Sequence, residues 1–438
     1  MRFTGSPARG LIGATLGFFF GFAAVALFGA TAQKFKEVLG LGQVMVGVLL
    51  AIPSLMGSLL RIPFAAWVDS TGGRKPFLVL LGLSVAGMAG LTLTVSVFSS
   101  RLSPSSLPIV LALGALCGCG IATFSVGISQ VSYWFPRSSQ GTALGVYGGV
   151  GNLAPGIFTL LLPLALAGFG LSGAYGAWLL MLVVGAVLYF VLGVNSPYFQ
   201  GLAGGRAPDQ ARKEAEAAGQ EMFPAGNAGK SLLASAREWR TWLLVIVYFC
   251  SFGGFMAMTA WLPLYWRTFL GVAPILAGVL SATYSIATSV VRVAGGRISD
   301  RLGGERTAAV SLGIMTAGAV LMVFTRDSHA VGFPLAATIV MALGMGVTNA
   351  AVFKLVPKLV PHAVGGASGW VGGLGAFGGF AIPPALSLFV LGEGARGYAD
   401  GFVVFIGLAV VSLALVIVLA RTPAGGEKSR TIARSATR

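Results

Sequence analysis

The sequence predicts an all-α membrane protein with twelve transmembrane helices in two pseudo-symmetric six-helix bundles. The 438-residue chain is 56% hydrophobic and only 10% charged, whereas soluble domains carry about 25% charged residues. Apolar stretches of about 20 residues, the length of a membrane-spanning helix, recur along almost the whole chain. Motifs of the first half return at matching places in the second half. The apolar runs are continuous and lack the alternating polarity of membrane β-strands, which excludes a barrel.

Twelve apolar stretches are expected to cross the membrane. They lie at residues 10–32, 44–66, 76–98, 107–130, 142–165, 173–194, 239–262, 273–296, 308–325, 332–354, 366–391 and 401–421. The first one is longer than the apolar core of a signal peptide, so we expect a retained helix. The long polar segment between the sixth and seventh stretches is predicted to contain a charged helix near 208–220. The expected parts are an N-terminal bundle (1–194), a cytoplasmic linker (195–238), a C-terminal bundle (239–421) and a cytoplasmic basic tail (422–438).

Lysine and arginine are divided unevenly between the two sides of the predicted membrane. Of the 29 basic residues, 21 lie in the N-terminus, the linker, the tail and the links on their side, and six lie in the opposite links. Because basic links stay in the cytoplasm, we expect both termini there and the chain in the cell (inner) membrane. The net charge of +16 therefore reports topology, and no nucleic-acid partner is predicted, since that requires a basic face on a soluble fold.

No motif for a metal, a cofactor or a catalytic centre occurs in the sequence. There is no CxxC, HExxH or phosphate-binding loop. Cys117, Cys119 and Cys250 lie within apolar runs and are expected to be buried thiols. We therefore predict no enzyme activity, no metal and no cofactor. A membrane sensor is disfavoured as well, because neither the linker nor the tail has the pattern of a signalling domain.

Three motifs recur in the same order in the two halves. Arg61 and Asp69 lie eight residues apart on the second stretch, and Arg292 and Asp300 lie eight apart on the eighth. The other repeated motifs are Gly118-x-Gly120 with Gly344-x-Gly346, and the glycine run Gly145, Gly148, Gly149, Gly151 with the run Gly369, Gly372, Gly373, Gly375. Transporters are often built from such repeats and hold substrate between the halves. The glycine runs predict close helix packing and surfaces along which helices slide.

Arg61 and Arg292 are the main functional candidates. Each lies about two helical turns inside the membrane from its Asp, where an arginine costs about 2.5–3.5 kcal/mol to insert and normally has an anionic partner. All thirteen acidic residues lie in links, linker, tail or the ends of spans, so the missing partner is predicted to be an anionic substrate. Two planar guanidinium forks suit a small oxyanion. The alternative is that each arginine reaches the interface or binds backbone carbonyls.

Further residues are candidates near this pair. Asn152 is the polar exception in the first glycine run, and its amide is expected to contact either the substrate or a neighbouring helix. Aromatic walls are expected from Phe124, Tyr284 and Phe353, with ordinary packing as the alternative. A cytoplasmic gate is expected from the residues around the links after spans two and eight, namely Asp69, Arg74, Asp300 and Arg301.

The link motifs resemble those of the major facilitator superfamily. Gly296-x3-Asp300-Arg301-x-Gly303 is similar to its pattern, whereas the first copy has Ala65 and Ser70 in place of the glycine and the basic residue. This resemblance implies the fold of that superfamily and says nothing about the substrate.

The glycine runs resemble the signatures of the nitrate/nitrite porter family within that superfamily. Gly148-Gly149-Val-Gly151-Asn152-Leu is similar to the first signature, and Gly375-Ala-Phe-Gly378-Gly379-Phe-x-Ile-Pro383 to the second. The resemblance covers nearly all twelve spans. It implies that Arg61 and Arg292 bind substrate and that Phe124 and Phe353 clamp it. The chain departs at residues 121–123, where Ile-Ala-Thr replaces the Gly-Gly-Asn of many relatives.

The expected activity is nitrate/nitrite antiport by a monomer that alternates access across the lipid bilayer. Two unit charges about 8 Å apart repel by about 2 kcal/mol at an effective dielectric of about 20, so an empty site resists closure and exchange is favoured. No carboxylate or histidine lies deep in a span, since His329 and His362 are in links, and this disfavours proton symport. The alternatives are nitrate/proton symport, carriage of formate or oxalate, and an anion channel.

Overall fold

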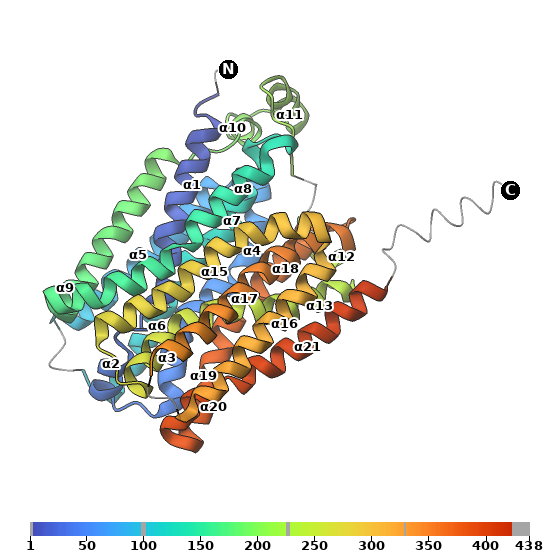
Figure 1. The fold of residues 1–438 in the computed structure, drawn as a ribbon. Coiled ribbons are helices and arrows are strands. Elements are labelled where there is room, and N and C mark those ends of the chain that lie inside the picture. Colours follow the sequence, from blue (N-terminus) through green and yellow to red (C-terminus); the bar gives the residue numbers. More distant parts are fainter. Residues whose placement is uncertain (1–2, 98–101, 225–227, 328–329, 423–438) are drawn as a thin grey trace.

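The computed structural model describes residues 3–97, 102–224, 228–327 and 330–422. Helices are the regular secondary structure throughout these ranges. Figure 1 shows them as two bundles side by side, one of blue-to-green helices and one of yellow-to-red helices. The predicted tail beyond Thr422, His329 and Arg101 lie outside the described residues.

The N-terminal bundle is built from long helices, several of which are interrupted within one crossing. They are α1 (Pro7–Phe22), α3 (Gln43–Leu59), α4 (Arg61–Thr71), α5 (Arg74–Val97), α6 (Leu107–Gly118), α7 (Thr123–Trp134), α8 (Arg137–Asn152) and α9 (Ala154–Leu192). Two short 3₁₀ segments, η1 (Ala23–Ala26) and η4 (Cys119–Ala122), extend α1 and join α6 to α7. The interruption at Leu60 matters most, because Arg61 is the first residue of the helix that follows it.

The C-terminal bundle repeats this arrangement. Its helices are α13 (Trp239–Tyr248), α14 (Gly254–Leu264), α15 (Pro274–Leu302), α16 (Gly304–Val323), α17 (Gly332–Leu359), α18 (Val364–Leu374), α19 (Gly378–Glu393) and α21 (Val403–Arg421). Two π-helical turns, η5 (Phe249–Gly253) and η6 (Tyr265–Phe269), interrupt the first crossing of this bundle. Such turns are rare and often mark functional positions.

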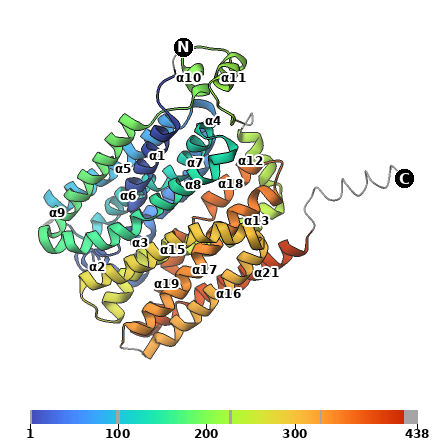
Figure 2. The same cartoon turned by 45° about the horizontal axis from the view of Figure 1, so that its top comes forward.

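Short helices lie outside the membrane crossings. They are α2 (Ala32–Leu39), α10 (Pro197–Ala203), α11 (Pro208–Ala217), α12 (Ala228–Ala236) and α20 (Gly397–Asp400). The charged helix predicted near 208–220 corresponds to α11. Figure 2 shows α10 and α11 together beside the N-terminus.

Among the described residues, eleven helical stretches are long and apolar enough to cross a membrane. The longest one, Ser138–Leu192, has 55 residues, and a straight helix of that length is about 80 Å long, against a hydrocarbon core of about 30 Å. Gly170 breaks it, with φ 63° and ψ −172°, a left-handed φ that favours glycine. This stretch therefore crosses twice, which yields the twelve predicted crossings.

The predicted repeat has a backbone counterpart at the links after the two aspartates. Gly72 ends α4 with φ 76°, and Gly303 ends α15 with φ 84°. Each glycine stands three residues after its Asp, so the two halves use the same left-handed turn. The glycine is required there because side chains disfavour this φ.

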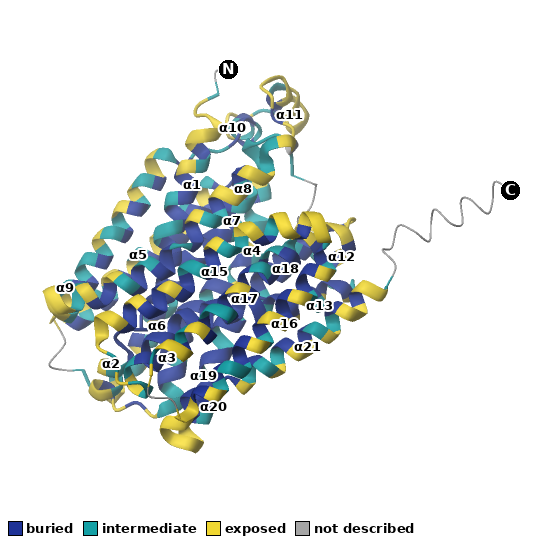
Figure 3. Cartoon of the chain, in the orientation of Figure 1, coloured by how far each residue is buried: buried dark blue, intermediate teal, exposed yellow. Residues whose placement is uncertain are grey.

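The outer faces of the bundles are apolar. Large hydrophobic side chains on them are exposed, for example Leu180 and Phe190 on α9 and Val410 on α21, and Figure 3 shows exposed positions along these outward surfaces. Contiguous apolar surface of this kind marks contact with another apolar phase. The chain is therefore a multi-pass membrane protein whose outer surface faces lipid.

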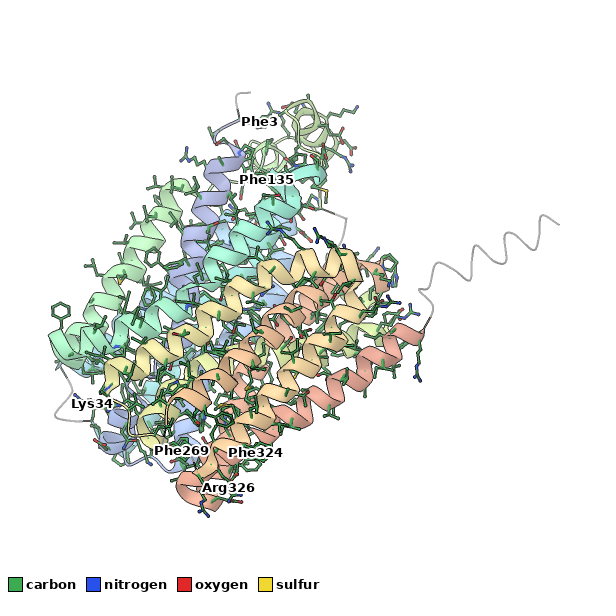
Figure 4. All side chains as sticks on the ribbon, in the orientation of Figure 1. Phe3, Lys34, Phe135, Phe269, Phe324 and Arg326 are labelled. Carbon is green, nitrogen blue, oxygen red and sulfur yellow. The ribbon has the colours of Figure 1, made fainter. Side chains whose placement is uncertain are left out.

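The molecule has two ends, which differ in how the bundles meet. The linker end carries Phe3 and Phe135, and the far end carries Lys34, Phe269 and Arg326 (Figure 4). At the far end, hydrogen bonds cross between the bundles: Gln43 donates to the Tyr398 hydroxyl at 3.3 Å and Arg267 donates to the Ala30 carbonyl at 3.4 Å. The two bundles are thus tied together at the far end.

Close contacts at glycines also join the two bundles on the far-end side of the molecule. A Cβ on Gly47 of α3 would lie 2.8 Å from the Pro383 carbonyl on α19, and one on Gly278 of α15 would lie 2.8 Å from Pro163 on α9. Only a hydrogen at these positions permits such an approach.

Candidate anion-binding site

Arg61 lies fully inside the protein. Its side chain is 0% exposed, because α4 begins within the membrane crossing and lies against α18 of the other bundle. Its Nη1 donates to the Gly372 carbonyl at 2.9 Å, while its Nε and Nη2 are buried without an acceptor. Unsatisfied buried donors on a charged group cost free energy, so this guanidinium is held ready for an acceptor.

Arg292 faces the same place from α15 of the C-terminal bundle. It is half-buried, and its Nη1 is buried without an acceptor. Its guanidinium carbon lies 5.8 Å from the ring centre of Phe124 and 5.4 Å from that of Phe252, and the Arg61 carbon lies 4.8 Å and 5.1 Å from the same two centres. The structure therefore brings the two arginines together across shared rings.

The pair has no acidic partner in the part of the chain that the structure describes. The ion pairs there join residues of the surface and linker, and neither arginine takes part in them. The two guanidinium groups carry like charges over the same two rings, so they repel each other. A small anion with several oxygens would satisfy the free N–H groups and remove this repulsion.

A stack of aromatic rings forms the wall of the site. Phe124 and Phe252 lie 6.0 Å apart with an interplanar angle of 24°, and Tyr248 stacks on Phe252 at 4.9 Å and 6°. Phe353 meets Tyr248 edge-on at 5.1 Å and 87°. The guanidinium groups of Arg61 and Arg292 lie over the faces of Phe124 and Phe252, and aromatic faces attract cations.

Sequence analysis missed Phe252 and Tyr248. Both come from the first crossing of the C-terminal bundle, and Phe252 lies in the π-helical turn Phe249–Gly253. Their spacing of four residues puts them on one helix face, and this was the available signal. The same signal occurs at many aromatic pairs in a chain with 29 Phe.

Asn152 is the last residue of α8, and it lies beside the helix of Arg292. Its carbonyl accepts a hydrogen bond of 2.8 Å from Ser289 Oγ, three residues before Arg292 on α15. Its Oδ1 is buried without a partner. The interhelical bond at this position thus uses the backbone, which leaves the amide available.

Tyr284 lies behind the rings that contact the arginines. Its hydroxyl contacts Met345 Sδ at 2.8 Å, and its ring is 6.4 Å from that of Phe255. Phe255 packs in turn on Phe252, with ring centres 5.8 Å apart, so Tyr284 is linked to the aromatic wall through one further ring.

The signature glycines fall into two groups by what a Cβ would meet. A Cβ would meet a neighbour closely at Gly151, Gly373, Gly375, Gly378 and Gly379, where the neighbours are Phe18, Ile62, Tyr248, Gly253 and Met256. A Cβ on Gly148 meets nothing within 4 Å, whereas those on Gly149 and Gly372 meet their nearest atoms at 3.4 Å and 3.9 Å. The glycines of the first group allow close packing against neighbouring residues in this conformation. Those of the second group have free space beside them.

Three of the four predicted gate residues are bonded within their own bundles. Asp69 accepts a hydrogen bond from Tyr133, and Asp300 pairs with Lys354. Arg74 donates to the Phe190 carbonyl at 2.9 Å, and Arg301 is exposed. In this conformation, these bonds do not cross between the bundles, in contrast to the bonds at the far end.

Two six-helix halves around a central cationic pair define a membrane transporter of the two-bundle type. The family description of the Major Facilitator Superfamily matches residues 13–383, and the chain belongs to this superfamily. The xylose transporter XylE from E. coli, in a partially occluded inward-open conformation, has a TM-score of 0.72 at 12% identity over 95% of this chain and 99% of that one. A D-xylose-proton symporter structure has a TM-score of 0.71 at the same identity, with 95% and 98% covered. These likenesses confirm the predicted fold.

Sequence relatives confirm the predicted branch of the superfamily. A probable nitrate/nitrite antiporter, NarK1 of Thermus thermophilus, is 31% identical over 391 residues, which cover 84% of this chain and 82% of the relative. A nitrite extrusion protein of Bacillus subtilis is 27% identical, with 85% and 84% covered. A probable nitrate transporter, NarT of Staphylococcus epidermidis, is 26% identical, with 86% and 87% covered. The chain is thus a relative of the nitrate/nitrite porters.

Proposed function

We propose that this protein carries nitrate and nitrite across the membrane and exchanges one for the other. The observation that carries the proposal is the pair Arg61 and Arg292, one from each bundle, with buried N–H groups that lack acceptors and guanidinium groups over the same two rings. A planar oxyanion between them accepts from both forks. The names of the relatives support nitrate and nitrite among such anions.

The proposed mechanism is alternating access by rocking of the bundles. The present conformation is tied at the far end by bonds such as Gln43–Tyr398, while Asp69 and Asp300 are bonded within their own bundles at the linker end. Closure at the linker end would bring α8 closer to the opposite bundle, into the space beside Gly148, while α18 already contacts the N-terminal bundle through the Arg61–Gly372 bond. The far-end bonds would then break and open the site to the other side.

Exchange follows from the charge of the empty site. Arg61 is already buried, so closure without an anion would also take Arg292 out of water and leave two cations with unsatisfied donors. The pair cannot be discharged because guanidinium keeps its proton. With an anion, the repulsion is offset and the donors are satisfied. The carrier therefore returns only when loaded, which favours antiport over proton symport.

We also propose the setting in which this exchange occurs. The protein works as a monomer in the cell (inner) membrane, with both termini and the linker in the cytoplasm. The excess of basic residues at the linker end supports this orientation.

The test is uptake of labelled nitrate into liposomes that contain the purified protein. One set is loaded with nitrite, and the other is empty with an imposed inward proton gradient. Antiport predicts uptake only into the nitrite-loaded set. Uptake into empty vesicles that follows the proton gradient would refute exchange and support symport. Competition by formate or oxalate that equals that by nitrite would refute the assigned substrate, and flux far above carrier turnover without counterflow would indicate a channel.

A further inference from the structure

Asn349 of α17 is a buried amide without a hydrogen-bond partner for its oxygen. Its side chain is 1% exposed, and its Oδ1 has no partner. The neighbouring Thr348 differs, because its hydroxyl bonds Ser311 of α16 at 2.8 Å and the Gly344 carbonyl at 2.8 Å. The polar contact of α17 with α16 is thus made by Thr348, and packing does not account for the amide.

The position of Asn349 on α17 directs it toward the arginine site. Helices α15 and α17 lie side by side in Figures 1 and 2. They approach closely at Gly346, where a Cβ would lie 3.3 Å from the backbone nitrogen of Arg292. Residues four apart share a helix face, and the residue four after Asn349 is Phe353, whose ring packs against Tyr248. Asn349 is therefore bracketed by the backbone of Arg292 and the aromatic wall.

An amide side chain can hydrogen-bond both to an anion and to Arg292. An oxyanion only accepts hydrogen bonds, and a guanidinium only donates them, whereas an asparagine side chain does both. Arg292 Nη1 is a buried donor without an acceptor, and Asn349 Oδ1 is a buried acceptor without a donor. One amide between them would satisfy the arginine through its oxygen and the anion through its NH₂ group.

We propose that Asn349 is a substrate-binding residue of the C-terminal bundle that donates its amide N–H to the anion and accepts from Arg292. This inference rests on the proposed function and deepens it. Each bundle then contributes one arginine and one amide: Arg61 with Asn152, and Arg292 with Asn349. The two amides come from non-equivalent crossings, since the repeat pairs Asn152 with Ala376 and Asn349 with Thr123.

The proposal predicts an effect on anion selectivity. Nitrite has two oxygens and nitrate has three. Nitrate thus presents one more acceptor oxygen than nitrite, and we assign the Asn349 amide to that additional oxygen. Loss of the Asn349 amide weakens nitrate binding more than nitrite binding.

The experiment compares the wild-type protein with Asn349→Ala and Asn349→Thr in the exchange assay. The threonine variant keeps a polar side chain of the kind found at the equivalent position 123. Thr348→Val is the matched control, because it removes a buried hydrogen bond from the same helix on the side of α16. Nitrate-dependent thermal stabilisation of the purified proteins measures binding apart from transport.

We expect both Asn349 variants to raise the KM for nitrate about tenfold, the effect of one lost hydrogen bond to a charged group, with a smaller rise for nitrite and little change in kcat. The stabilisation by nitrate falls in parallel, whereas Thr348→Val keeps the wild-type KM. An unchanged KM in a folded Asn349 variant, or an equal rise in the control, overturns this proposal. If the wild-type protein itself neither binds nor exchanges nitrate, the proposed function fails instead.

Discussion

Arg61→Lys separates the charge of the site from its geometry. The substitution keeps the positive charge but replaces a planar fork by a single ammonium group. In the structure, Arg61 uses Nη1 for the Gly372 carbonyl and leaves Nε and Nη2 for an acceptor. A lysine has one nitrogen for all three tasks, so it cannot hold α18 and also grip an anion through two parallel bonds.

The expected magnitude follows from the bonds that are lost. A hydrogen bond to a charged group is worth about 1.5–3 kcal/mol, and 1.4 kcal/mol is tenfold in affinity. Loss of one of the two bonds to the anion therefore predicts an affinity that is about 10- to 150-fold weaker. Long-range attraction of the anion is unchanged because the charge remains.

The assay is nitrite-driven nitrate exchange in liposomes as a function of nitrate concentration, with nitrate-induced thermal stabilisation as the binding measurement. Arg297→Lys serves as the control, since Arg297 is exposed on α15 near the linker end. A similar loss in that control would point to a general defect in the protein. Near-normal affinity and exchange in Arg61→Lys would refute the argument that the site recognises a planar oxyanion by a fork.

Three other substitutions test the glycine runs and the aromatic wall. Gly373→Ala places a Cβ 2.6 Å from Ile62 and is expected to lower turnover and thermal stability, because the bundles meet there in this conformation. Gly148→Ala meets nothing within 4 Å here, so it should keep stability but slow exchange if the opposite conformation closes on this position; unchanged kcat would contradict that closure. Phe252→Leu removes the ring shared by both guanidinium groups and should raise the KM several-fold, since cation–π contacts are worth about 0.5–2 kcal/mol, whereas wild-type KM would show that the ring only packs.

The polar residues proposed for the site are only partly related by the internal repeat. The two arginines are related by the repeat, but the amides Asn152 and Asn349 are not. A doubled bundle needs matching helices to pack, whereas the proposed substrate is a single small anion that does not require the same side chains from each half. The repeat therefore governs the scaffold more strictly than the lining of the site.

The sequence by itself determined the fold class, the membrane crossings and the arginine pair. Hydropathy over about 20 residues depends only on local composition, and the repeat of Arg61–Asp69 in Arg292–Asp300 is visible as spacing. An arginine within an apolar run carries a large insertion cost, so the sequence alone marks it as a functional candidate. The sequence also predicts separate crossings at 142–165 and 173–194, on either side of the break at Gly170, because the thickness of the bilayer limits the length of one crossing.

Only the tertiary structure decided which of the many apolar and aromatic side chains meet the arginines. Phe252 and Tyr248 join the site, whereas Tyr284 turns to Met345, and all three are aromatic residues within spans. The π-helical turn at Phe249–Gly253 shifts which residues face inward, and the close approach of α17 to α15 at Gly346 supports the proposed place of Asn349. In a membrane span, lipid-facing and interior positions have similar polarity, so the sequence pattern does not distinguish the face that packing turns toward the site.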